Sequence, residues 1–442
     1  MSDGHKGVFK EAFKEMLLEK NFRVEPHIFR RSIKYEIISQ KALIAIGVRR
    51  SGKTTFLKQI CSDLIQKQKI SENQIVYINF SDERLLNVQS NDLQDILSAH
   101  HELFPELEET QTVHYFLDEI QMVKNWELFV DRLIRSSTRQ VYITGSSSKL
   151  LSKEIATQMR GRSISYEIFP FGFTELLEWE GIETKLLSTK KKAKVYKRFE
   201  KYLFEGGFPE VVHQPQYIQR KILQEYFTTL LMKDVIERHN PSNPVAVQTT
   251  LNIAMNQISG LYTINKLFER LKSLSFKVQK SDVTEYLDWF QEAYALFSVP
   301  IFVESFHKQN VNPKKISSID NGLTCAVSTS LSKSTGHLLE NLVFLTFRRL
   351  EKKIYYFRDR YQHEVDFVVL DEFEKPVLYQ VSVSLKEESV KERELKSLFA
   401  AMKQLNLKKA TLFTLNEKFI IEQEKHKVYV RPLWEFLLEV KM

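Results

Sequence analysis

Cysteine is scarce in this sequence of 442 residues, which contains only Cys61 and Cys325. Two cysteines this far apart exclude a disulfide scaffold and are typical of a reducing compartment, so we expect both thiols to be small hydrophobic side chains. No apolar run approaches the roughly 18 residues that a membrane-spanning helix needs. The N-terminal segment, MSDGHKGVFKEAFKEMLLEK, lacks the apolar centre and the cleavage site of a secretory signal. These absences predict a cytoplasmic protein with no membrane partner.

The composition that remains is that of an ordinary globular protein. Hydrophobic residues make up 43%, aromatic residues 12% and charged residues 27% of the chain, which excludes disorder along its whole length. At about 150 residues per domain, the length predicts roughly three domains. The formal net charge of +8, from 64 basic and 56 acidic residues, is compatible with a nucleic acid partner and equally with a lysine-rich solvated surface.

Three polar stretches, at 188–198, 239–244 and 308–321, interrupt the hydrophobic patterns and indicate domain limits. The first domain alternates short apolar strands with longer helical patterns, which predicts an α/β fold with a parallel sheet covered by helices on both faces. The middle domain reads as helical, and the last domain returns to mixed helix and strand. We therefore expect domains at 1–240, 241–305 and 306–442.

The segment from residue 47 to 54 reads GVRRSGKT and matches the phosphate-binding pattern G-x-x-x-x-G-K-[ST]. An apolar strand precedes it and a helical pattern follows it, which is the context this loop requires. Its backbone amides and the helix N-terminus would surround a phosphate chain, with Lys53 at the β- and γ-phosphates and the Thr54 hydroxyl on Mg²⁺. The residues expected to bind the nucleotide are Gly47, Arg49, Arg50, Ser51, Gly52, Lys53, Thr54 and Thr55.

A second apolar strand at 113–117 ends in Asp118 and Glu119. Two carboxylates at the end of a buried strand are costly unless a cation lies beside them. We expect Asp118 to hold the Mg²⁺ ion and Glu119 to orient and polarise the attacking water. The catalytic residues predicted here are thus Glu119 and Lys53.

A third strand at 141–144 is followed by Gly145-Ser146, and Met159-Arg160-Gly161-Arg162 comes soon after. Thr144 and Ser146 are small polar groups that would sense the γ-phosphate, although the same residues also form ordinary turns and helix caps. A guanidinium neutralises the charge that grows on a transferred phosphoryl group. Arg162 is our preferred catalytic arginine over Arg160, acting in its own chain or in a neighbouring subunit, and surface solvation is the alternative for both.

Taken in order, GVRRSGKTT, FLDEIQ, ITGSSS, RGRSISYEIFPFGFTE, YLFEGGFPE and KDVIER resemble one family. The sequence is similar to bacterial and archaeal AAA-type ATPases that carry a restriction-endonuclease-like C-terminal domain. The resemblance extends over nearly the whole chain. It implies an AAA module, a winged-helix-like middle and a nuclease-fold end, with ATP and Mg²⁺ as cofactors. It also makes Arg162 a candidate arginine finger. AAA modules often act as rings because this arginine comes from a neighbour, so a homo-oligomer is one expectation, and a single-chain switch is the alternative.

The middle domain contains three helical patterns, at 248–258, 264–271 and 282–297, in an order similar to winged helix-turn-helix modules. A helix that reads DNA needs basic or amide side chains on its exposed face. The third helix instead offers Asp282, Glu285 and Asp288, which phosphates would repel. We therefore favour a protein contact over DNA binding here.

The C-terminal domain has the outline of a nuclease with an altered centre. Restriction-endonuclease-like sites use a helix acid, a strand acid and a Glu-x-Lys pair to bind metal and activate water. Glu340 and Asp366 match the two acids and are weak candidates for metal ligands, but the third element reads Gln380-Val381-Ser382. Without those two charges, we expect the domain to cleave no phosphodiester, although Lys386 stands near enough in sequence to replace the missing lysine.

The leading hypothesis is an ATP-binding protein, a Mg²⁺-dependent ATPase whose nucleotide state repositions its C-terminal interaction domains. The first alternative is an ATP-dependent nuclease or nucleic-acid-processing enzyme, and the second is a non-catalytic DNA-binding regulator. The expected partners are ATP and either a nucleic acid or a protein client. The sequence leaves the client and the number of subunits open.

Overall fold

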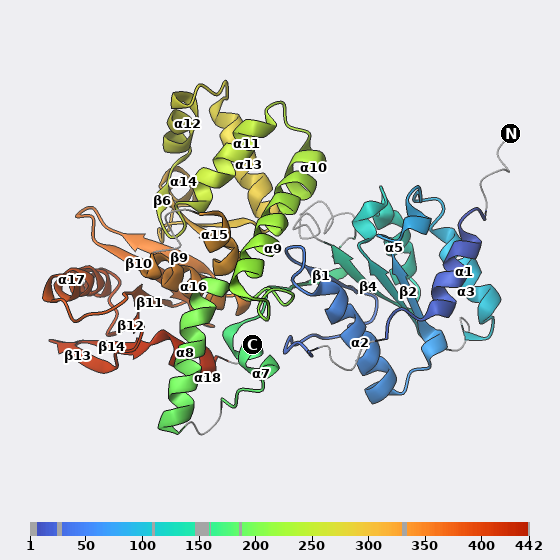
Figure 1. The fold of residues 1–442 in the computed structure, drawn as a ribbon, viewed down its shortest axis with the longest axis horizontal. Helices are drawn as coiled ribbons and strands as arrows, with labels where there is room; N and C mark the ends of the chain where they lie inside the picture. The colour runs from blue at the N-terminus through green and yellow to red at the C-terminus, as the bar shows by residue number, and fades with distance from the viewer. Residues whose placement is uncertain are drawn as a thin grey trace. The chain divides into compact units, whose positions relative to one another are not determined.

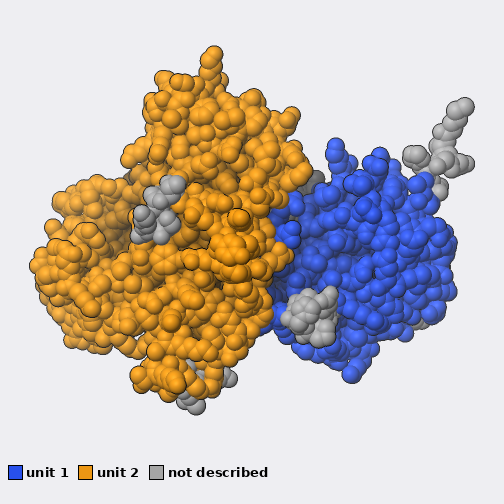
Figure 2. All heavy atoms as spheres, viewed as in Figure 1, with its two compact units in different colours: residues 1–168 blue, residues 169–442 orange. Residues whose placement is uncertain are grey.

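A computed structural model of the chain describes residues 7–23, 29–107, 111–145, 159, 161–184, 188–328 and 334–440. The chain divides into two compact units, residues 1–168 and 169–442 (Figures 1 and 2). The predicted domain limits at 240 and 305 both lie inside the second unit, so the three-domain division stays a prediction. Within the described ranges, no helix is long and apolar enough to span a bilayer.

The first unit is built on a five-stranded sheet with the order β2-β3-β4-β1-β5, and every neighbouring pair of strands is parallel (Figure 1). This confirms the parallel α/β fold that the strand and helix patterns predict. Its strands are β1 (Ala42–Ile46), β2 (Ile75–Asn79), β3 (Val113–Asp118), β4 (Arg139–Gly145) and β5 (Ser163–Glu167). Its helices are α1 (Lys10–Glu19), α2 (Lys53–Gln68), α3 (Gln94–Leu103) and α5 (Trp126–Ile134).

Both faces of this sheet are buried, which explains why its strands read as continuous apolar runs. Leu43 and Ala45 of β1 share one core with Phe56 and Ile60 of α2. Ile44, between them, has no exposed surface and faces the opposite side of the sheet because successive strand side chains alternate. The sheet is therefore the middle layer of three, and its carboxyl edge is left to carry polar groups.

The second unit begins with helices α7 (Phe173–Trp179), α8 (Thr189–Glu205) and α9 (Gln216–Thr229). The lysine-rich stretch 188–198, interpreted from the sequence as a break, is instead the cap and first half of α8. Ser188 accepts a hydrogen bond from the Lys191 amide at the start of that helix, the usual role of an N-cap serine. The break at 239–244 is confirmed, since α10 (Glu237–His239) ends there and α11 (Pro244–Met255) begins.

The middle of the chain is not all-helical. Helices α11, α12 (Ile264–Ser273) and α13 (Lys280–Glu292) accompany a small antiparallel sheet with the order β6-β8-β7. Its strands are β6 (Leu261–Tyr262), β7 (Leu296–Val299) and β8 (Lys314–Ser318). The polar stretch 308–321, predicted to be a domain limit, thus contains α14 (Phe306–Val311) and the central strand of this sheet. The sheet therefore crosses the predicted limit at 305.

The C-terminal part of the second unit is a six-stranded mixed sheet with the order β13-β14-β12-β11-β10-β9. Helix α17 covers one face, where Leu398 and Met402 join the core. Aromatic side chains of α16 and α18 lie on other strand positions, with Phe347 against Tyr379 and Phe436 against Phe413. The strands are β9 (Ile354–Arg358), β10 (Glu364–Leu370), β11 (Pro376–Val381), β12 (Lys409–Thr414), β13 (Phe419–Gln423) and β14 (His426–Pro432), and the helices are α15 (Asn321–Val327), α16 (Thr335–Arg349), α17 (Glu388–Gln404) and α18 (Leu433–Glu439).

The glycine pair after α8 has a packing reason in this unit. Asp320, which is 3% exposed, caps α15 and accepts a hydrogen bond of 2.8 Å from the Gly207 amide. A Cβ atom on Gly207 would lie 2.1 Å from the Phe171 carbonyl oxygen, so only glycine allows this approach. Burial raises the pKa of Asp320 to about 6. The central part of the EGGFPE segment, Gly206 to Phe208, is therefore a buried junction of the fold.

Candidate nucleotide-binding site

The predicted phosphate loop connects the end of β1 to the start of α2, as its sequence context requires. Gly47 has φ +149° and Gly52 has φ +99°, both in the region that favours glycine. A Cβ atom on Gly47 would lie 2.2 Å from the Ile168 carbonyl oxygen. The loop therefore turns tightly against the residue that follows β5, and Gly52 forms the N-terminal cap of α2.

The interior of this loop holds polar groups that suit a phosphate. Lys53 is 5% exposed, and its ammonium group donates to the carbonyl oxygens of Gly47 at 3.1 Å and Val48 at 3.0 Å. The Ser51 hydroxyl is buried and forms no hydrogen bond with the part of the chain that the structure describes. An unsatisfied hydroxyl and a buried ammonium at a helix N-terminus fit an anionic group. Arg49, Arg50 and Thr55 lie in the same loop and first helical turn, with Arg50 exposed.

Arg31 binds the backbone of the phosphate loop, a contact that the sequence did not indicate. Its side chain is buried, and Nη1 donates to the Ser51 carbonyl oxygen at 2.8 Å. The Arg31 backbone is held in turn by the Gln59 side chain of α2, which accepts from its amide and donates to its carbonyl. Arg31 follows no motif and lies 16 residues upstream of the loop, so only the fold brings it there.

Asp118 lies at the carboxyl end of β3 with no exposed surface. One carboxylate oxygen accepts hydrogen bonds from the hydroxyl groups of Thr54, at 3.3 Å, and Thr144. The other accepts from the Tyr77 hydroxyl at 2.8 Å. Burial raises the pKa of Asp118, and the hydrogen bonds from Thr144 and Tyr77 oppose this shift. The structure thus brings together the two predicted Mg²⁺ ligands, Thr54 and Asp118, and adds Tyr77, which the sequence did not indicate.

Glu119 and Thr144 are also adjacent. The Glu119 amide donates to the Thr144 hydroxyl at 2.9 Å, and Glu119 adopts φ +56°, a left-handed conformation that costs energy for a non-glycine residue. Its carboxylate accepts a hydrogen bond from Gln121. Thr144 therefore contacts both acidic residues, an arrangement that suits the sensor role predicted for it. Strands β1, β3 and β4 place all of these groups at the carboxyl ends of the strands, where open parallel sheets bind ligands.

Arg162, the predicted catalytic arginine, lies at the amino ends of the strands, opposite to the end that carries these groups. The Arg162 carbonyl accepts a hydrogen bond from the Ala42 amide, and Ser163 pairs with Ala42 where β1 begins. Five strand residues, about 16 Å, separate this point from the phosphate loop. The Arg162 guanidinium lies 3.8 Å from Asp131. A role for Arg162 at the site of its own chain does not fit this position. The role in a neighbouring subunit stays a prediction, with surface solvation as its alternative. Ser146 and Arg160 lie outside the described residues.

In the second unit, three acidic side chains surround a lysine that the sequence did not indicate. Lys315 of β8 has a side chain that is 3% exposed, and its ammonium group lies 2.8 Å from Glu340, 2.8 Å from Asp366 and 3.0 Å from Glu364. Burial lowers the pKa of Lys315, but the attraction of these three carboxylates outweighs it and the net shift is upward. Burial, with repulsion from Asp366, raises the pKa of Glu340 to about 8.

Gln380 and Ser382, the two positions at which the nuclease motif is altered, bring no charge to this part of the structure. The Gln380 side chain accepts from the Asp366 amide at 3.1 Å and donates to Glu394 at 2.6 Å. The Ser382 hydroxyl donates to the Ser384 carbonyl. Glu340 and Asp366 therefore do meet, as predicted, but the position between them holds an ammonium group. No group of three or more histidine, cysteine or acidic side chains in the described ranges is arranged to hold a metal ion.

Comparison with known proteins identifies the first part of the chain and leaves the function of the later parts open. Residues 39–177 match the family model described as "AAA domain". Residues 196–335 and 335–436 match two models described as "Domain of unknown function", DUF8612 and DUF4143. The fold and the site thus define the first unit as an AAA-type domain, which at the level of the family is an ATP-binding ATPase. The restriction-endonuclease-like nature of the C-terminal part stays a prediction.

The chain belongs to the same family as an uncharacterized protein of the archaeon Methanocaldococcus jannaschii. The two sequences are 35% identical over 97% of this chain and 96% of the relative. An uncharacterized protein of Haemophilus influenzae is 29% identical over 69% of this chain and 73% of its own length. A Walker-type ATPase structure from Pyrococcus abyssi covers 74% of this chain and 96% of its own, with a TM-score of 0.39 and 14% identity.

Proposed function

We propose that this protein is a Mg²⁺-dependent ATPase whose nucleotide state changes the position of the second unit. The observation that carries the proposal is the group formed by Thr54, Asp118 and Thr144 beside the loop of Lys53. With Tyr77, which donates to Asp118, the group comprises four polar side chains from three strands and one helix. Two of them, Asp118 and Thr144, have no exposed surface. A fold tolerates this concentration of buried polar groups most readily where a charged ligand compensates it.

Each residue has a defined part in this proposal. Lys53 releases the carbonyl oxygens of Gly47 and Val48 and donates to the β- and γ-phosphates. Thr54 and Asp118 would hold the Mg²⁺ ion, which would neutralise phosphate charge when bound. Glu119 accepts a proton from the attacking water or orients it, while Thr144 fixes the backbone of Glu119 and the carboxylate of Asp118.

The route to the second unit begins at Ile168, the last residue of the first unit. Its amide donates to the Ile46 carbonyl at 2.6 Å, and its own carbonyl oxygen lies against Gly47. Any rearrangement of the phosphate loop therefore reaches the connection to residue 169 through direct backbone contact. We propose that nucleotide binding uses this contact to reposition the second unit, the type of switch in which phosphate contacts order a nearby segment.

The test is Mg²⁺-ATP binding by calorimetry together with steady-state hydrolysis. Lys53→Ala should abolish binding, while Lys58→Ala, one turn further along α2, should leave it unchanged. Glu119→Gln should bind ATP normally and hydrolyse it about 100-fold more slowly, because loss of a general base typically costs that much or more. Small-angle scattering of Glu119→Gln with and without ATP then measures repositioning. A wild-type protein that binds no ATP would contradict the ATPase proposal, and identical scattering curves would contradict only the repositioning.

The two alternatives gain no supporting observation. A nuclease needs an accessible metal between Glu340 and Asp366, and Lys315 lies there instead. A DNA reader at α13 would present Glu285 and Asp288, both exposed, to phosphates. We therefore propose neither function for these parts of the chain.

A further inference from the structure

Helix α8 carries four lysines on one exposed stripe. Lys190, Lys194, Lys197 and Lys201 follow one another at intervals of four, three and four residues, and all four are exposed. This spacing places them on the same face of a helix, about one per turn over roughly 16 Å. Their neighbour Lys191 forms an ion pair with Glu183, but no ion pair joins the four stripe lysines to a carboxylate within the described part of the chain. Glu200 is also exposed and lies between Lys197 and Lys201 in the sequence, so the stripe is a row of positive charge in excess of one nearby carboxylate.

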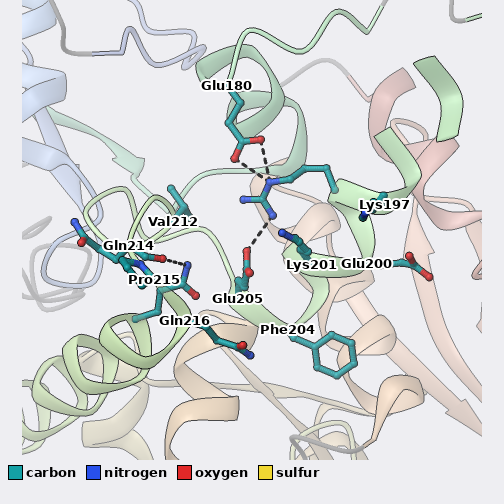
Figure 3. A pocket seen from close by; sticks show the side chains of 12 residues that line it. Glu180, Lys197, Glu200, Lys201, Phe204, Glu205, Val212, Gln214, Pro215 and Gln216 are labelled. Atoms are coloured by element: carbon teal, nitrogen blue, oxygen red, sulfur yellow. Dashed lines mark hydrogen bonds and ion pairs between the residues drawn. The ribbon is translucent and has the colours of Figure 1, made fainter. Parts of the chain in front are cut away.

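An aromatic ring continues the same face. Phe204 follows Lys201 by three residues and is 36% exposed, so part of its ring surface is accessible to a ligand. Phe204 and two of the stripe lysines line an open pocket of about 780 Å³ between α8 and the start of α9 (Figure 3). The basic stripe therefore ends at a cavity with an aromatic wall.

Inside this pocket, the charge of an arginine is balanced by its acidic partners, so the pocket offers hydrogen-bonding groups rather than an excess of charge. Arg198, with a side chain 10% exposed, donates from Nε to Glu180 at 2.8 Å and from Nη1 to Glu205 at 3.1 Å (Figure 3). Its Nη2 group makes no hydrogen bond within the described ranges and remains able to donate. The amide side chains of Gln214 and Gln216 lie on the opposite wall, with both donors and acceptors. The pocket thus suits a flat polar group with donors and acceptors on its edge.

These features match a single-stranded nucleic acid better than other polyanions. Non-specific binders of single strands combine a basic track for the backbone with aromatic side chains on which bases stack. Lysines at one per turn provide the track, Phe204 provides the stacking surface, and the pocket provides partners for a base edge. An acidic peptide would use the lysines but has no base for Phe204, and duplex bases are already stacked and paired.

We propose that the exposed face of α8 binds single-stranded nucleic acid, with its phosphates along Lys190, Lys194, Lys197 and Lys201 and one base stacked on Phe204 at the pocket. This surface belongs to the second unit, whereas the residues of the nucleotide site belong to the first. It also differs from the interface considered at α13, which is acidic. The ligand class is thus a single-stranded RNA or DNA, and the base chemistry is shared by both.

The test is fluorescence anisotropy of the full-length protein with labelled oligo-dT and oligo-U of about 16 nucleotides, a site size found for single-strand binders. Replacement of the four stripe lysines by glutamate should weaken binding at least tenfold. Because each phosphate contact with a single strand contributes about 0.7 to the slope of log K against log salt, that slope should become shallower by up to about 3. The control replaces four exposed lysines of the α12–α13 region, Lys266, Lys272, Lys277 and Lys280, by glutamate for the same change in net charge.

Phe204→Ala should weaken binding about tenfold with an unchanged salt slope, since stacking contributes without counterion release. Phe373→Ala, at a ring that is 79% exposed elsewhere, is its control and should bind as the wild type does. Comparison of oligo-dT with oligo-U assigns the source as DNA or RNA.

Three results would overturn the proposal. The first is that the wild-type protein shows no salt-sensitive binding. The second is that the control lysine variant loses as much affinity as the stripe variant. The third is that duplex DNA, or a polyglutamate peptide, binds as tightly as the single strands. Circular dichroism and thermal unfolding of each variant show whether the fold is retained, as expected because lysine and glutamate have similar helix propensities.

Discussion

Replacement of Lys315 by methionine tests the buried ion cluster of the second unit. Methionine keeps the apolar stem and removes the ammonium group, so Glu340, Glu364 and Asp366 lose their shared cation. Removing one partner of a buried ion pair typically costs about 3–5 kcal/mol, because the remaining charge has no compensation. Glu364 is 32% exposed and water screens part of its charge, so the value should fall toward the lower end.

The assay is urea unfolding, with thermal unfolding as support. A loss of about 3–5 kcal/mol corresponds to a decrease in Tm of roughly 6–20 °C for a large domain. The loss should grow as the pH rises from about 5 to 8. Without Lys315, the folded carboxyl groups hold their protons to higher pH than the unfolded ones, so the folded variant binds more protons and its stability falls as pH increases.

A matched triple variant separates charge from packing. Lys315→Met combined with Glu340→Gln and Asp366→Asn removes two of the unpaired charges and should recover a large part of the lost stability. If Lys315→Met changes the free energy of unfolding by less than about 0.5 kcal/mol, the size expected of an ordinary surface substitution, the reasoning is refuted. It is refuted also if the triple variant is less stable than the single variant at pH 8.

Two further predictions concern the nucleotide site. Tyr77→Phe removes a hydrogen bond that lowers the pKa of Asp118, so that pKa rises further. On acidification the Mg²⁺-ATP affinity should therefore fall at a higher pH than in the wild type, as calorimetry across pH measures. An equal loss of affinity at every pH would contradict this reading of Tyr77. Gly47→Ala drives a Cβ atom to 2.2 Å from the Ile168 carbonyl and should cost about 1–3 kcal/mol of stability together with ATP binding. Gly161→Ala, which also has a positive φ but no atom within 4 Å of its Cβ, is the control, and equal melting temperatures for the two variants would remove the steric argument.

The phosphate loop and its partner acid were predictable because they depend on short-range rules. A glycine-rich turn between a strand and a helix has few conformations, and parallel strands bring their carboxyl ends to one edge. Lys53, Thr54, Asp118 and Glu119 therefore follow from motif and strand positions. Tyr77 does not, because it is an interior residue of β2, and nothing in its local sequence shows that its hydroxyl ends beside Asp118.

Two interpretations failed because a polar stretch was read as a break between folded elements. The stretch 188–198 was taken as a break, yet its lysines are the solvent face of α8, whose buried side carries Val195 and Phe199. The stretch 308–321 was also taken as a break, yet Lys315 is among the most buried charged side chains described. A lysine can be buried where carboxylates from other elements surround it, and those lie 25 to 51 residues further along the chain.

By itself, the sequence determined the parallel sheet of the first unit and the chemistry of its loop, since strand alternation, glycine placement and helix starts are local properties. Only the tertiary structure decided which charges meet. It placed Arg162 where β5 begins, away from the loop, and it placed Lys315 among three acids, of which Glu340 and Asp366 were the metal-ligand candidates of the sequence. Electrostatic partners are chosen by distance in space, and that distance follows from how sheets and helices pack rather than from the order of residues.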